Sequence, residues 1–130
     1  MRKIFVTIGG VLLILFGLFH LSFWSLFDWE NELVKLNPAN SNIMQMLNIG
    51  SFVILFSLGF ILLYLRKEIL STQLGRAILF VSSLFFFARL IMEFVFKKPA
   101  LPIVVVLFIC VLVYLIPALT CNKKEINTDN

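Results

Sequence analysis

Charged residues are scarce in this chain, and long stretches contain none. Asp, Glu, Lys and Arg make up 14% of the 130 residues and apolar residues make up 61%. Typical soluble domains contain about 25% charged residues and roughly 45–50% apolar residues. A domain of this size buries only around two-thirds of the surface that its unfolded chain exposes. The excess of Phe, Leu, Ile and Val cannot be hidden from water, so the composition excludes an ordinary soluble protein and predicts a lipid environment.

Cysteine and histidine are also rare, which excludes several kinds of site. The two cysteines, Cys110 and Cys121, lie on one predicted helix, eleven residues apart. That separation is roughly 16 Å along the axis, and a disulfide requires a Cα distance under about 7 Å. With His20 as the single histidine and no CxxC pair, structural zinc, a dithiol centre and a haem held by two histidines of one chain are excluded. We expect no metal and no cofactor.

Uncharged apolar runs have the length of membrane-spanning helices. About 20 residues are needed to cross a hydrocarbon core of roughly 30 Å. The predicted spans are about 4–27, 43–65, 75–96 and 100–120; only the third is interrupted, by Arg76, Arg89 and Glu93. The sequence therefore predicts an all-α integral membrane protein, a four-transmembrane-helix bundle formed by a single domain over 1–122. Residues 123–130 are predicted to be a polar, disordered cytoplasmic tail.

The distribution of positive charge predicts the orientation, because cytoplasmic segments carry the excess of Lys and Arg. One side has Arg2, Lys3, Arg66, Lys67, Arg76, Lys123 and Lys124, and the other has Lys35, Lys97 and Lys98. The count is seven to three, so both termini are predicted to be cytoplasmic in a multi-pass protein of the cell (inner or plasma) membrane. The net charge of +4 is then a headgroup and orientation signal, and no nucleic-acid partner is expected.

Polar residues inside the predicted spans are costly and need a reason. They fall at helical spacing on faces that also carry small residues, which favour close helix contacts. The first face comprises Gly10, Leu13, Gly17, His20 and Trp24; the second comprises Gln45, Asn48, Phe52 and Gly59; the third comprises Gly75, Ser82, Arg89 and Glu93. Given the predicted orientation, the polar members share the outer half of the membrane. We therefore expect one polar ligand or lipid pocket there, lined by His20, Trp24, Gln45, Asn48, Arg89 and Glu93.

Each candidate also has a plain structural explanation. His20, Gln45 and Asn48 suit hydrogen bonds between helices, and Arg89 with Glu93 suits an internal ion pair at i, i+4 or two side chains that reach the headgroups separately. Phe85, Phe86 and Phe87 are predicted to face lipid, and Tyr114 to anchor the last helix at the membrane interface. Trp29 is predicted to lie at the interface in the outer segment 28–42, where Asn42 is the predicted cap of the second helix.

In size and layout the chain resembles the broad group of small four-helix bacterial membrane proteins that includes the DoxX-like proteins. The resemblance covers the whole length but rests on architecture without a diagnostic motif. The chain lacks the Glu that small multidrug transporters have in their first helix, and it lacks the cysteine pair of vitamin K epoxide reductase-like proteins.

The function favoured by the sequence is a non-catalytic binding or accessory membrane protein whose partners are the bilayer and a lipid or small amphipathic ligand. A homo-oligomer or a larger membrane complex is left open, and no catalytic residue is assigned. One alternative is a membrane-embedded enzyme that uses Glu93 or His20 as acid or base, with Arg89 stabilising negative charge. The other is a small oligomeric transporter.

Overall fold

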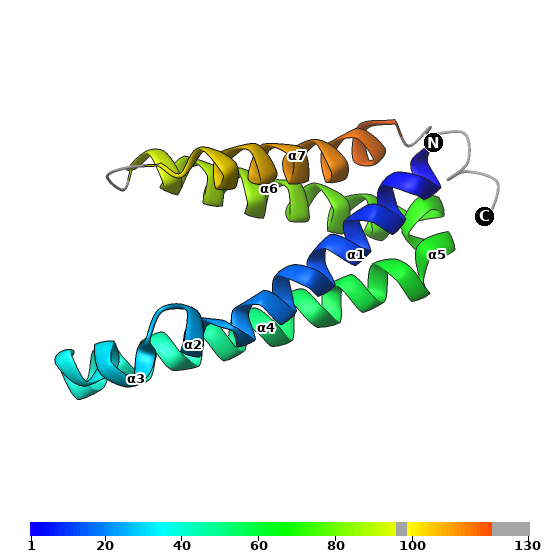
Figure 1. The fold of residues 1–130 in the computed structure, drawn as a ribbon. Helices are drawn as coiled ribbons and strands as arrows, with labels where there is room; N and C mark the ends of the chain where they lie inside the picture. The colour runs from blue at the N-terminus through cyan, green and yellow to red at the C-terminus, as the bar shows by residue number, and fades with distance from the viewer. Residues whose placement is uncertain (96–98, 121–130) are drawn as a thin grey trace. The chain divides into compact units, whose positions relative to one another are not determined.

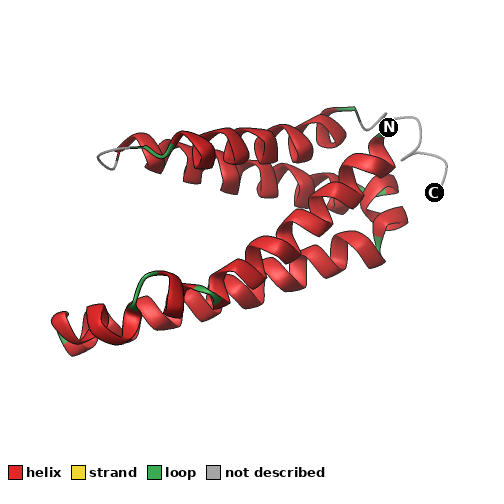
Figure 2. Ribbon diagram, in the orientation of Figure 1, coloured by secondary structure: helices red, strands yellow, loops and turns green. Residues whose placement is uncertain are grey.

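The computed structural model describes residues 1–95 and 99–120, and these residues form helices and connecting loops with no strand among them (Figure 2). Within this described part, four helices are long and apolar enough to cross a membrane. They are α1 (Arg2–Leu21), α4 (Pro38–Tyr64), α6 (Gln73–Val95) and α7 (Leu101–Leu119). The prediction of an all-helical chain with four such helices is confirmed. The predicted tail 123–130 lies outside the described residues.

The first helix is shorter than predicted. The uncharged run 4–27 was expected to be continuous, but α1 ends at Leu21 and a separate short helix, α2 (Phe23–Leu26), follows. The backbone N–H and the hydroxyl of Ser22 both donate to the Phe19 carbonyl, at 3.0 and 2.7 Å. This tight turn satisfies a carbonyl at the helix end, and such turns commonly close a helix. Apolarity alone did not reveal the break.

The segment 28–42, which the sequence predicts on the outer side of the membrane, is largely helical. It contains α3 (Trp29–Glu32) and η1 (Leu33–Lys35), and α4 begins at Pro38, earlier than the predicted 43. The Asn37 side chain accepts a hydrogen bond from the Ala39 N–H at 2.9 Å, so Asn37 caps α4 with proline in its first turn. The predicted cap at Asn42 is wrong, because that residue lies inside the helix.

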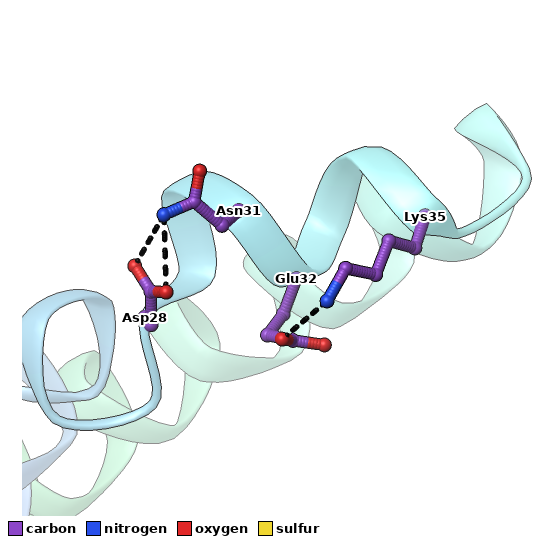
Figure 3. Close-up of polar contacts among 4 residues, drawn as sticks. All are labelled: Asp28, Asn31, Glu32 and Lys35. Carbon is purple, nitrogen blue, oxygen red and sulfur yellow. Dashed lines mark hydrogen bonds and ion pairs between the residues drawn. The ribbon is translucent and has the colours of Figure 1, made fainter.

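Two polar pairs lie along the segment from Asp28 to Lys35 (Figure 3). Asp28 adopts the left-handed conformation at φ 49°, which Asp tolerates better than most residues. Its carboxylate accepts two hydrogen bonds from the Asn31 amide at 3.0 Å each, and Glu32 pairs with Lys35 at 2.6 Å.

The short basic loop after α4 also contains a helix, α5 (Arg66–Ser71). The turn into α6 requires glycine at position 75, because a Cβ there would meet the backbone of Ile69. The Gly75 N–H donates to the Thr72 hydroxyl at 3.0 Å, which caps the first turn of α6. Nearer the other end of the chain, Pro102 lies in the first turn of α7, where proline is favoured.

The chain divides into two compact units, and each is described by itself. Unit 2 comprises Gly10–Ile61, and unit 1 comprises Met1–Gly9 with the described residues from Leu62 onward. In unit 2, α1 and α4 pack closely at glycines: a Cβ on Gly59 would lie 2.7 Å from the Gly10 carbonyl oxygen, and one on Gly17 would lie 3.1 Å from the Phe56 backbone nitrogen. The small-residue face predicted for the first helix is therefore a helix contact.

In unit 1, α6 and α7 run side by side (Figure 1). The buried Ser83 hydroxyl donates to the Val111 carbonyl at 3.1 Å, and the rings of Phe86 and Tyr114 stack with centroids 5.4 Å apart. The Tyr114 hydroxyl donates to the Gly9 carbonyl at 2.6 Å. These contacts join α7 to α6 and to the first turns of α1.

Candidate functional site

His20 and Asn48 form a polar contact between the two long helices of unit 2. Near the end of α1, the backbone carbonyl of His20 accepts a hydrogen bond from the Asn48 side-chain nitrogen of α4 at 2.8 Å. The His20 Nδ1 lies 2.7 Å from the Phe16 carbonyl oxygen. Because a carbonyl only accepts, Nδ1 carries the proton in this contact, and Nε2 is the acceptor of the neutral ring. His20 thus contacts α4 through its backbone carbonyl, and its ring bonds within its own helix.

The oxygen of that amide is unsatisfied. Asn48 Oδ1 is buried and has no hydrogen-bond donor among the described residues. Leaving a buried acceptor without a donor costs about 1–3 kcal/mol, and natural structures contain few such groups. Exchanging the positions of Asn48 Oδ1 and Nδ2 would not provide a donor for the oxygen, because the oxygen would then face the His20 carbonyl, which is also an acceptor. A donor from outside the described chain would be stabilised at this position.

Aromatic rings surround this end of the helix pair. The Phe23 ring of α2 stacks on the His20 imidazole, with centroids 4.8 Å apart and an interplanar angle of 26°. Phe23 also contacts Trp29, and Trp29 contacts Trp24, with centroids 6.1 and 6.2 Å apart. Trp29 is only 7% exposed and Trp24 is 49% exposed. The Trp29 ring therefore packs inside the cluster that follows α1, and its predicted position at the membrane interface stays a prediction.

Gln45 forms hydrogen bonds within its own helix. Its side-chain nitrogen lies 3.3 Å from the Ser41 carbonyl and 3.4 Å from the Ser41 hydroxyl, one turn earlier in α4. These long contacts bind the amide loosely to the helix backbone.

Arg89 and Glu93 form the contact that their spacing predicted. In α6, Arg89 Nη2 lies 2.7 Å from Glu93 Oε1, and the two side chains are 49% and 13% exposed. Arg89 precedes the end of α6 by six residues, which is roughly 9 Å along the axis. The carboxylate is largely covered, so its charge is balanced chiefly by the guanidinium.

The structure thus brings the candidates together in pairs. His20 and Asn48 meet in unit 2, where Gln45 and Trp24 also lie, and Arg89 and Glu93 meet in unit 1. The convergence of all six on one pocket stays a prediction. Among the described residues, no group of three His, Cys, Asp or Glu side chains could hold a metal ion.

Sequence reasoning missed the polar and aromatic contacts between α6, α7 and the start of α1. Tyr114 is fully buried and is not an interface anchor, because its hydroxyl bonds to the Gly9 carbonyl. Phe86 is buried against Tyr114, although Phe85 and Phe87 are exposed as predicted. The available signal was the helical period: Phe86 follows Leu79 and Ser82 at spacings of seven and four residues, and both are buried.

Comparison of the chain with models of protein families, with curated proteins and with solved structures found no match.

Proposed function

We propose that this chain is a multi-pass protein of the cell membrane with both termini on the cytoplasmic side. The proposal is supported by the four long apolar helices and by a contact in unit 1. Arg66 Nη1 donates to the Thr7 hydroxyl at 2.9 Å, so the start of α5 lies beside the first turns of α1. Arg2, Lys3, Arg66 and Lys67 accordingly flank the same end of unit 1, as expected of a cytoplasmic end.

Reporter fusions test this orientation. Reporters placed after Asn130 and at the exposed Val34 should report opposite compartments, with the first in the cytoplasm. A C-terminal reporter outside the membrane would contradict the orientation, and two reporters in one compartment would contradict the number of crossings.

Within this frame, the chain is a non-catalytic binding or accessory protein, and His20 and Asn48 bind a hydrogen-bond donor of a lipid headgroup or small amphipathic ligand. The observation that carries the proposal is the buried Asn48 Oδ1, which lacks a donor among the described residues. A polar group kept in an apolar helix pair at this cost suggests a bound partner. Arg89 and Glu93 give weaker support for a ligand site, because each already compensates the charge of the other.

Native mass spectrometry of the purified protein tests the binding site. Asn48→Leu removes the amide but keeps the branching of the side chain. The matched control Ser51→Ala removes a hydroxyl that donates to the Leu47 carbonyl of the same helix. We expect a co-purifying mass on the wild type and the control, and its loss from Asn48→Leu. A mass retained equally by both variants, or absent from the wild type in several mild detergents, would contradict the proposed binding.

A further inference from the structure

The segment that follows α1 has an exposed apolar edge at its start. Trp24 and Leu26 of α2, together with Phe27, are 49%, 56% and 50% exposed. On the other side of the same segment, Trp29 and Leu33 are buried. The chain therefore places one of its two tryptophans inside the fold and leaves the other uncovered. A large apolar surface at this position needs a partner.

The length of α1 indicates the depth of this edge. Twenty residues at 1.5 Å each span about 30 Å, the thickness of the hydrocarbon core. If the basic start of α1 lies at the cytoplasmic surface, the chain leaves the hydrocarbon near Leu21, and the edge follows at once. Leu18, Phe19 and Leu21, at the end of α1, are also exposed apolar residues. The same medium would cover both surfaces.

The charges of the segment lie beyond the edge. No charged residue occurs between Lys3 and Asp28, and the next charges are Glu30, Glu32 and Lys35. Asp28 and Glu32 are engaged with Asn31 and Lys35 in exposed contacts, as Figure 3 shows. Three acids against one lysine disfavour attachment to anionic headgroups by charge. An apolar edge bordered by solvated acids instead suits the boundary between headgroups and acyl chains, where tryptophan is enriched.

We propose that Trp24, Leu26 and Phe27 rest in the headgroup–acyl boundary of the outer leaflet and hold the segment 22–36 against the membrane. The proposal rests on the proposed membrane insertion and orientation. The partner is the lipid interface itself, independent of any ligand bound at His20 and Asn48. Trp29 instead packs within the segment, so the two tryptophans have different surroundings.

The presence of only two tryptophans makes the test direct. The full chain and its Trp24→Phe variant are reconstituted into phosphatidylcholine vesicles whose acyl chains are brominated either near the headgroup or near the terminal methyl. Bromine quenches indole fluorescence on contact. The variant reports Trp29 alone, and the difference between the two proteins reports Trp24. The buried Trp29 is left unchanged, which protects the fold. Flotation of the vesicles on a density gradient measures insertion separately.

We expect the emission of Trp24 to fall by about half or more with shallow bromine and by less with deep bromine, in keeping with an interfacial ring. The emission of Trp29 should change little with either lipid. Equal quenching of both tryptophans, or none of Trp24 in protein that floats with the vesicles, would overturn the interfacial edge alone. Quenching of Trp24 that disappears as the protein-to-lipid ratio rises would indicate a second copy as the partner and also overturn it. Failure to float would overturn the proposed membrane insertion.

Discussion

Replacing Gly59 by alanine should destabilise unit 2, although alanine is the better helix former. A Cβ at this position would lie 2.7 Å from the Gly10 carbonyl oxygen and 2.9 Å from the Ile14 nitrogen, closer than a Cβ normally approaches either atom. Both are backbone atoms of α1 and cannot rotate away. Overpacking typically costs about 1–3 kcal/mol, and we expect the upper part of that range. Alanine regains roughly 1 kcal/mol of helix propensity, so the expected net loss is about 1–2 kcal/mol.

Gly50 provides a matched control in the same helix. A Cβ at Gly50 would meet nothing within 4 Å. Gly50→Ala should therefore leave the free energy of unfolding unchanged or raise it by up to about 1 kcal/mol. The measurement is reversible unfolding of the detergent-solubilised protein with sodium dodecyl sulfate, followed by circular dichroism and analysed as a free energy against denaturant mole fraction.

The comparison of the two variants decides the question. If Gly59→Ala and Gly50→Ala had the same free energy of unfolding, the close approach of α1 and α4 at Gly59 would be refuted. If Gly50→Ala were the more destabilising variant, the face of α4 that contacts α1 would have been assigned to the wrong side of the helix.

Further predictions concern unit 1 and use the same unfolding measurement. Tyr114→Phe should lose about 0.5–1.5 kcal/mol, because it removes the buried donor to the carbonyl of α1; no loss would contradict that bond. Phe86→Ala should cost about 3–5 kcal/mol and Phe85→Ala far less, since only the former is buried; equal costs would contradict the packing. A double-mutant cycle of Arg89→Met and Glu93→Gln should give a coupling above about 0.5 kcal/mol, and additivity would contradict the ion pair.

The sequence by itself determined the number of long apolar helices and, within a few residues, the positions of α6 and α7. These features depend on runs of apolar residues long enough to match a hydrocarbon core, a one-dimensional property. The contact of Arg89 with Glu93 was also predictable, because the i, i+4 spacing of a helix brings such side chains together. The position at which α1 ends was not predictable from the sequence, because it depends on hydrogen bonds of Ser22 within an otherwise uniform apolar run.

Only the tertiary structure decided which of several equivalent residues is covered. Gly50 and Gly59 are identical in kind, as are Phe85 and Phe86, and Trp24 and Trp29. In each pair one member is closely covered within its own unit and the other is more open. Composition cannot separate them, because in a chain this apolar the residues that face lipid are as hydrophobic as those that face a neighbouring helix. The difference arises from the close approach of particular backbones and rings, which is a property of the packed helices.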